Sequence, residues 1–308
     1  MFDIVGKRFW FFLISGVVIL IGIISLATFG LKAGIEFSSG SMMRVSFDQA
    51  VEQGSLKEEL ASLGYPNAIV QSTGENTFLI RTRELISEAK ENLTSALEAK
   101  FGHIAETEFY SVSPMVAGET VRNAAIALAI AAIGILLYVT WAFRRMPDPF
   151  HYGSCAIIAL IHDTVVALGV FSILGGILGW EINLMFIVGI LAVIGYSINN
   201  TVVVFDRIRE NLIMGISSSF EVIVNNSLVE TLSRCLNTSI TTLFVILALI
   251  FFVGASIQNF AVVMLVGLIA GTFSSMCIAP TLLIVWEKGE WGRFLHWLPL
   301  GGAKTKSR

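Results

Sequence analysis

The chain has 308 residues, of which 55% are hydrophobic and only 14% are charged, and its mean hydropathy is +0.78. Soluble globular domains carry roughly 25% charged residues, so this composition excludes a soluble protein and indicates an integral membrane protein. The net charge of −3 gives no reason to expect a nucleic-acid partner. The three cysteines lie in or beside apolar segments and the four histidines show no ligand spacing, so we expect no metal site.

Six apolar segments are long enough to cross a bilayer, which takes about 20 residues. They cover approximately residues 9–30, 122–143, 153–178, 183–205, 237–256 and 259–286. The first segment exceeds the roughly 7–15-residue apolar core of a cleaved signal peptide, so we interpret it as an uncleaved anchor. The chain is therefore predicted to be a polytopic α-helical membrane protein.

The only large polar region, 31–120, lies between the first and second spans. Its pattern predicts a strand, a helix, a two-strand hairpin, a second helix and a last strand, over residues 42–47, 55–63, 68–72 with 77–82, 84–101 and 106–112. This order is that of a ferredoxin-like α+β domain. Ser55 with Glu58 is typical of a helix capping box. The region carries seven Lys and Arg against thirteen Asp and Glu; this acidity indicates either a solvated surface or a face that attracts basic peptides.

The distribution of basic residues predicts the orientation of the chain, because Lys and Arg concentrate on the cytoplasmic side. They flank one side of the spans at Lys7, Arg8, Arg144, Arg145, Arg207, Arg209, Arg234 and in the tail 287–308. We therefore expect residues 1–30 to hold a cytoplasmic N-terminus and the first span, 31–120 to be periplasmic, and 121–286 to hold the other five spans. The tail 287–308 is expected to be cytoplasmic.

The stretch 206–236 is amphipathic, with Ser218 and Glu221 in capping-box spacing and apolar residues at helical intervals. We expect an interfacial helix here, which either packs against the membrane or offers a docking surface to a partner.

Asp163 is a carboxylate near the middle of the third span. A lone charge there costs about 2.5–3.5 kcal/mol on insertion scales, so it needs a partner or a proton. It indicates either proton or conformational coupling, or a structural hydrogen bond between helices.

The end of the fourth span gathers polar side chains at Ser197, Asn199, Asn200 and Thr201, and Asn199 shares a helix face with Asp206 seven residues later. Such groups either form a polar pathway or hold helices together by hydrogen bonds.

Arg234 precedes the fifth span, and Thr238, Thr241 and Thr242 fall on the same helix face. Arg234 is either an anchor at the membrane surface or part of a polar seam where it holds a carboxylate.

Gly267 and Gly271 form a G-x-x-x-G pair, which permits close helix packing. We find no nucleophile with a base, no phosphate-binding loop and no cofactor fingerprint, and expect neither enzyme activity nor a cofactor.

Four stretches together resemble the SecD–SecF family of bacterial protein export, in its SecF branch: 195–211, 236–242, 161–163 and 34–40. The resemblance covers essentially the whole chain. The family usually has Gly-Leu/Ile-Asp-Phe-x-Gly-Gly after the first span. Here Gly34, Phe37 and Gly40 match, Glu36 keeps the acid, and Ser39 replaces a glycine.

The resemblance implies an RND-like half that pairs with SecD in the inner membrane, beside the SecYEG channel and a YajC-like subunit. It implies that the pair uses the proton-motive force at a late stage of preprotein translocation, after SecA has acted. A coupling seam in the bilayer is then expected at Asp163, Asn199, Asn200, Thr201, Asp206, Arg234 and Thr238.

Asn200 stands where the family usually has an acid that is implicated in proton transfer. Either SecD carries the proton, or Asp163 takes over, or this chain is impaired at the position; we favour the first. Two other functions stay open: an RND-type half-transporter for a lipid or small molecule, and a purely structural stabiliser of the translocon.

Overall fold

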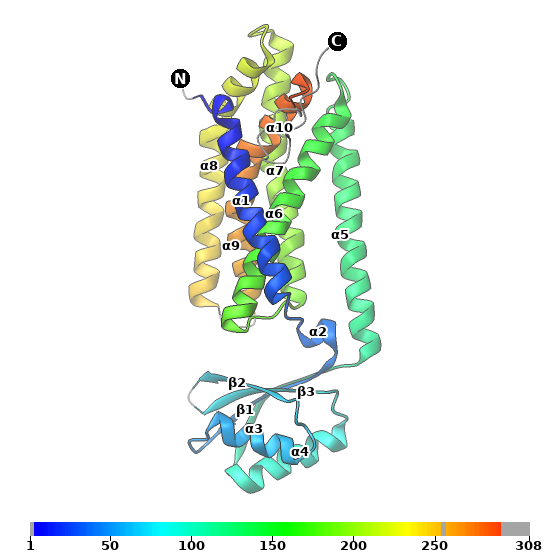
Figure 1. The fold of residues 1–308 in the computed structure, drawn as a ribbon, viewed down its shortest axis with the longest axis vertical. Helices are drawn as coiled ribbons and strands as arrows, with labels where there is room; N and C mark the ends of the chain where they lie inside the picture. The colour runs from blue at the N-terminus through cyan, green and yellow to red at the C-terminus, as the bar shows by residue number, and fades with distance from the viewer. Residues whose placement is uncertain (1–2, 75, 254–256, 291–308) are drawn as a thin grey trace, which may run out of the picture. The chain divides into compact units, whose positions relative to one another are not determined.

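The computed structural model describes residues 3–74, 76–253 and 257–290 (Figure 1), and the chain divides into two compact units. The smaller unit is Ala33–Ile126, and the larger one combines Met1–Lys32 with Ala127–Arg308. Most of the basic tail 287–308 lies outside the described residues.

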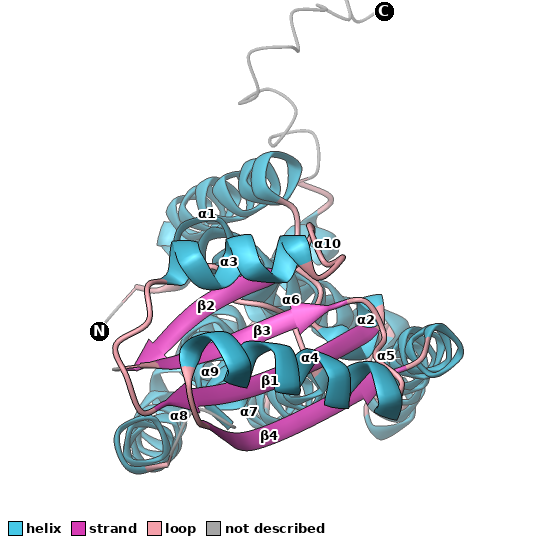
Figure 2. Cartoon of the chain, turned by 90° about the horizontal axis from the view of Figure 1, so that it is seen from below, coloured by secondary structure: helices cyan, strands magenta, loops and turns pink. Residues whose placement is uncertain are grey.

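The smaller unit is an antiparallel sheet with both helices on one face (Figure 2). The sheet order is β2-β3-β1-β4, formed by β1 (Gly40–Phe47), β2 (Ile69–Gly74), β3 (Thr77–Thr82) and β4 (Ile104–Val112). The covering helices are α3 (Gln53–Ser62) and α4 (Ser87–Phe101). Leu56, Leu60, Leu93 and Leu97 of these helices are buried against the sheet. The ferredoxin-like expectation is therefore confirmed.

Two local predictions in this unit are wrong. Helix α3 begins at Gln53 and has no side-chain cap at Glu52, so Ser55 lies inside the first turn and forms no capping box. Helix α4 begins at Ser87 rather than at residue 84, because the Leu85 N–H donates to Ser41 Oγ at 2.8 Å and the chain is held against β1.

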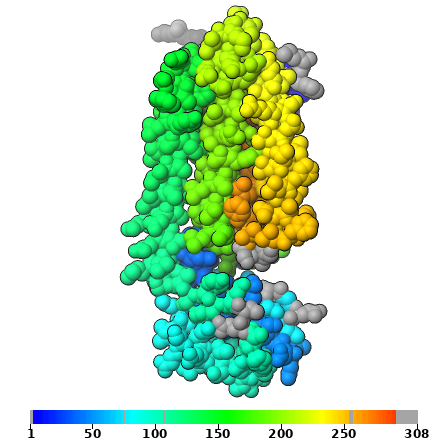
Figure 3. All heavy atoms as spheres, turned by 180° about the vertical axis from the view of Figure 1, so that it is seen from behind, coloured from blue at the N-terminus to red at the C-terminus, as the bar shows by residue number. Residues whose placement is uncertain are grey.

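Six helices, among the residues that the structure describes, are long and apolar enough to cross a membrane, and all of them except the first part of Pro114–Ala142 belong to the larger unit. They are Val5–Phe29, Pro114–Ala142, Pro149–Leu178, Leu184–Met214, Phe220–Phe252 and Gln258–Lys288. The six predicted spans are confirmed. The first five contain α1 (Arg8–Phe29), α5 (Pro114–Ala142), α6 (Pro149–Leu178), α7 (Leu184–Met214) and α8 (Phe220–Phe252). Figure 3 shows α5, α7 and α8 as neighbouring columns on one face.

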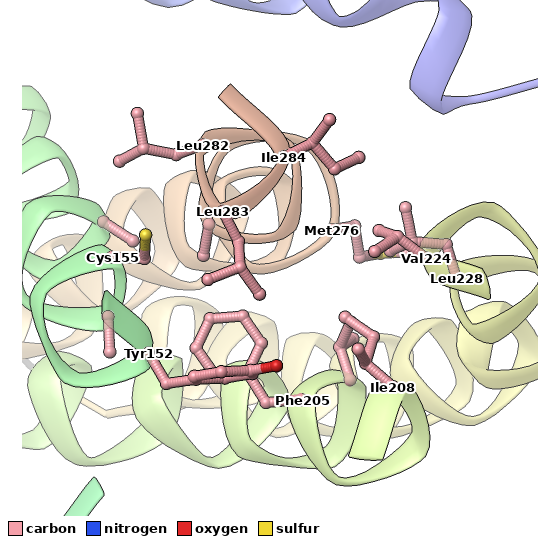
Figure 4. Close-up of a cluster of buried hydrophobic side chains, with 14 of the residues drawn as sticks. Tyr152, Cys155, Phe205, Ile208, Val224, Leu228, Met276, Leu282, Leu283 and Ile284 are labelled. Carbon is pink, nitrogen blue, oxygen red and sulfur yellow. The ribbon is translucent and has the colours of Figure 1, made fainter. Parts of the chain in front are cut away.

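The expected interfacial helix at 206–236 is wrong as a separate element. Residues 206–214 continue α7, and residues from Phe220 onward begin α8, with a turn at Gly215 between them. The apolar side chains of the stretch pack into the bundle instead of the bilayer surface: Ile208, Val224 and Leu228 are buried beside Phe205 and Leu283 (Figure 4). Ser219, not Ser218, precedes α8 and makes no cap, so this second capping box is also wrong.

The sixth span is interrupted. Helix α9 (Gln258–Phe273) passes into a π-helical segment, Ser274–Ile278, and then into α10 (Ala279–Lys288), which has Pro280 in its first turn. Proline lacks the N–H that would continue the ordinary ladder of hydrogen bonds, which explains why the helix changes its winding just before it. Single π turns inside helices are frequent at functional sites.

Small residues bring the helices into close contact. A Cβ added at Gly169 of α6 would lie 2.5 Å from Gly22 Cα of α1, and one added at Gly267 of α9 would lie 2.2 Å from Val193 Cγ2 of α7. The close packing predicted from G-x-x-x-G is confirmed, and it brings polar groups of α6, α7 and the π segment together.

Candidate functional site

Asp163 lies near the midpoint of α6 and is 1% exposed. Its Oδ2 accepts two hydrogen bonds, from Ser197 Oγ of α7 at 2.6 Å and from Ser274 Oγ at the start of the π segment at 2.9 Å. Its Oδ1 lies 2.9 Å from Nδ1 of His162. Three helical elements thus converge on one carboxylate, and every oxygen has a partner.

The same region links the π segment to α7 a second time. Thr201 Oγ1 donates to Ser275 Oγ at 2.9 Å, and Ser275 Oγ donates to the Ser197 carbonyl at 3.1 Å. All three residues are buried. A displacement of the π segment would therefore break bonds to Thr201 and Ser197 as well as to Asp163.

Asn200 belongs to a separate buried group. Its Nδ2 lies 3.5 Å from Ser239 Oγ of α8, which is 2.7 Å from Thr272 Oγ1 of α9 and 3.3 Å from the Tyr196 hydroxyl. These are neutral groups that join α7, α8 and α9. In this position the amide acts as a hydrogen-bonding residue between helices and holds no exchangeable charge.

The remaining predicted seam residues lie on the outside of the bundle. Asn199 and Arg234 are exposed, and among the described residues no carboxylate pairs with Arg234. Thr238 Oγ1 donates back to the Arg234 carbonyl at 2.9 Å, and Asp206 pairs with Arg209 on its own helix at 2.7 Å. The structure thus brings Asp163 and Thr201 into one hydrogen-bonded cluster, and it separates Asn199, Asp206, Arg234 and Thr238 from it.

Asn199 lines a groove of about 580 Å³ between α5 and α7. Helix α5 is the least buried of the spans, with 6% of its most apolar window inside the bundle. Ile130 and Tyr138 of α5 line the groove and are largely exposed. This face is therefore left uncovered by the chain itself.

The loop at 34–40 lies in the smaller unit. Gly34 precedes a single helical turn, α2 (Ile35–Ser38), and Gly40 opens β1 at φ +120°, where an added Cβ would lie 2.5 Å from the Thr82 carbonyl. Ser39 has φ 62° and ψ 169°, a conformation that glycine adopts far more easily. Burial lowers the pKa of Arg81, and the nearby charge of Glu36 acts against this effect. The motif therefore shapes a turn and places its acid near a cation.

Sequence reasoning missed His162, Ser274 and Ser239 as members of these buried groups. His162 is 6% exposed and directly precedes Asp163. Neighbouring residues on a helix normally point apart, so only its position inside an apolar span could have signalled the contact. Within the described ranges, no group of three or more His, Cys, Asp or Glu could hold a metal ion.

Comparison with known proteins identifies relatives of the chain. A family model described as "Protein export membrane protein SecD/SecF, C-terminal" matches residues 92–289, and a "SecD/SecF GG Motif" model matches 24–51. The chain is 42% identical over 308 residues to the protein translocase subunit SecF of Thermobaculum terrenum, covering 96% of this chain and 97% of that protein.

The fused translocase subunit SecDF of Bacillus subtilis is 35% identical over 294 residues, which cover 94% of this chain but 38% of SecDF. The crystal structure of SecDF from Thermus thermophilus, described as a translocon-associated membrane protein, superposes with a TM-score of 0.82 at 30% identity. That match covers 93% of this chain and 39% of the SecDF chain, so this chain corresponds to about two fifths of a SecDF protein.

Proposed function

The chain belongs to the SecD/SecF family of protein-export membrane proteins, and we propose that it is an accessory subunit of the Sec translocase that couples the proton-motive force to preprotein movement. The fused relatives support SecD as the partner that supplies the other part of the assembly. We propose in addition that the pair works beside the SecYEG channel, with a YajC-like subunit, after the SecA-driven step.

One observation carries the proposal: a carboxylate is held at the centre of the membrane bundle by groups on three elements. Ser197 and Ser274 both donate to Asp163, and Ser274 begins the segment that interrupts the sixth span. Ionisable groups inside a membrane are expensive and mark ion or proton pathways. A change of protonation at this buried site alters the two hydroxyl bonds to Asp163, so it can change the position of the π segment.

The exposed polar residues support a partner on the outer face of α7 and α8. Asn199 and Arg234 lie on the surface near or within the bilayer, where unsatisfied polar groups are costly. We propose that SecD covers this face and pairs with Arg234, while Thr238 and Asp206 lie at the margin of the contact. The inner-membrane orientation that we propose has both termini in the cytoplasm and the smaller unit in the periplasm, in agreement with the positive-inside rule.

The test is preprotein export in vesicles that contain the chain with SecD and the SecYEG channel, with and without an imposed proton gradient. Asp163→Asn is expected to remove the stimulation by the gradient, because the amide lacks the buried charge on which the coupling depends. Glu210→Gln is the matched control: it removes a carboxylate of α7 that pairs with Arg207, without touching the buried cluster or the proposed SecD contact. Equal stimulation in Asp163→Asn and the native complex would refute the role of Asp163.

Two further variants separate the contributions of the subunits. Arg234→Met is expected to weaken gradient-stimulated export while the complex still assembles, because the cation pairs with SecD. Asn200→Asp asks whether an acid at this position adds to the response. A native complex that responds fully without it would mean that the coupling needs no acid at residue 200, whereas a response that requires the substitution contradicts coupling through the buried Asp163 group.

A further inference from the structure

The membrane bundle contains one charged residue and one histidine at its centre, and they are adjacent. Across the apolar stretches 9–31, 123–143, 152–178, 184–205 and 235–286, Asp163 is the only Asp, Glu, Lys or Arg, and His162 is the only His. Both side chains are buried, and His162 Nδ1 lies 2.9 Å from Asp163 Oδ1. No other residue of these stretches can supply a cation to balance the carboxylate.

We propose that His162 is the group that takes up and releases the proton, and that Asp163 is its fixed counter-charge. The inference rests on the proposed coupling function and identifies which side chain of the dyad exchanges. Histidine is the side chain whose ordinary charge change falls between about pH 5 and 8. The Asp163 carboxylate accepts from two serine hydroxyls, so it is the fixed acceptor of the dyad.

The hydrogen-bond geometry decides where the proton lies. Ser197 and Ser274 both donate to Oδ2, so a shared proton can lie only between Oδ1 and Nδ1. Two hydroxyl donors stabilise the carboxylate form of Asp163, and the proton therefore lies on Nδ1 of the imidazole. A second proton on Nε2 makes His162 an imidazolium and the dyad neutral, and its loss leaves imidazole with carboxylate and a net charge of −1.

No neighbouring element offers a group that compensates this change of charge. Helix α1, which packs against α6, has no titratable side chain between Arg8 and Lys32. On α7 the phenol of Tyr196 bonds to Ser239, and the sixth span contributes only Cys277 in this region. Phe273 lies beside the imidazole with its ring centre 6.3 Å away. The charge of the dyad must therefore be balanced by movement of dipoles.

The dipoles that can respond are the hydroxyls of the π segment. Ser274 bonds to Asp163, and the next residue, Ser275, bonds to the Ser197 carbonyl and to Thr201. When the dyad carries a net charge of −1, the hydrogen bonds from these hydroxyls are stronger, and when the dyad is neutral they are weaker. The protonation state of His162 is thus transmitted to the one place where the sixth span departs from α-helical winding.

The decisive variant is His162→Asn, assayed in the vesicles with SecD and SecYEG described above. Asparagine presents an N–H near the position of Nδ1, so it preserves the hydrogen bond to Asp163, but it cannot take up a proton. We expect gradient stimulation to fall to the level seen without a gradient. His151→Asn is the matched control from the same helix: His151 stacks on Trp286 outside the buried cluster, and its variant is expected to keep the stimulation. Native stimulation in His162→Asn would overturn the proposal.

A second measurement separates failure of this inference from failure of the coupling function. In the reconstituted complex with ¹⁵N-labelled histidine, the ring signals that disappear in His162→Asn belong to His162. We expect these signals to change between imidazole and imidazolium from pH 8 to pH 5, and to change at a different pH in Asp163→Asn. A ring that keeps one protonation state over the whole range overturns the proposal, whether or not export responds to a gradient.

Discussion

Gly267→Ala tests whether the close approach of α7 and α9 holds the buried carboxylate in place. The new Cβ would lie 2.2 Å from Val193 Cγ2, 2.5 Å from Cγ1 and 2.8 Å from Cβ. Carbon atoms in contact are about 3.5–4.0 Å apart, so the helices must separate by more than 1 Å or Val193 must rotate. Rotation gives little relief, because both methyl groups and the Cβ itself overlap the new atom.

The expected loss is about 1–3 kcal/mol of unfolding free energy, the usual range for overpacking. The effect reaches the site because the next turn of each helix carries Ser197 and Gly271, and an added Cβ at Gly271 would already lie 2.9 Å from Ser197 Cβ. Separation at Gly267 therefore lengthens the 2.6 Å bond from Ser197 to Asp163. We expect gradient-stimulated export to fall together with stability.

Unfolding free energy can be measured by denaturant titration in mixed micelles, and export in the reconstituted vesicles. Gly16→Ala is the control, because an added Cβ there meets nothing within 4 Å. Val193→Ala removes the two methyl groups that overlap most and leaves only the 2.8 Å approach of Cβ, so the double variant Gly267→Ala/Val193→Ala should regain part of the lost stability and export. If Gly267→Ala is as stable as Gly16→Ala, or if Val193→Ala deepens the defect, the packing argument is wrong.

Three further changes test other parts of the fold. Ser39→Gly should stabilise the smaller unit by about 1 kcal/mol, since strained backbone positions cost of the order of 1–3 kcal/mol, and slower hydrogen exchange of β1 would show it. Arg8 bonds to Glu221 at 3.1 Å and to Glu290 at 2.8 Å with only 8% exposure. Arg8→Met should therefore destabilise the larger unit by about 1.5–3 kcal/mol in a micelle unfolding titration. Arg207→Ala removes exposed ion pairs and should leave the same titration unchanged; a clear loss would show that this surface is buried in the isolated chain.

The elements were predictable from the sequence wherever one physical signal dominates. The length of the apolar segments predicted the six membrane helices, and the order of predicted strands and helices indicated the ferredoxin-like unit. Boundaries failed where a tertiary contact competes with local propensity, as at Leu85, which Ser41 holds outside α4. The prediction of an interfacial helix at 206–236 was wrong for a similar reason. Its apolar face was recognised correctly, but the sequence does not reveal whether that face is covered by lipid or by Phe205 and Leu283.

The candidate site was predictable in composition but not in arrangement. Asp163 stands out because it is the only charged residue inside the central apolar stretches of the spans, where a carboxylate needs a partner. Spacing placed Arg234 and Thr238 correctly on one face, but spacing cannot show whether that face points inward. Ser274 gave no signal, because a serine in an apolar helix usually bonds to its own backbone, and the change in winding near Pro280 redirects it to Asp163.

The proposed coupling does not require an acid at residue 200. The Asn200 group joins α7, α8 and α9 by neutral bonds, which hold the helices at any pH. The Asp163 group joins α6, α7 and the π segment through a charge, which makes those bonds sensitive to protonation. The two groups share α7 but use different partners of the sixth span, Thr272 for the first and Ser274 for the second. The neutral group can therefore serve as a fixed point against which the charged group moves the π segment.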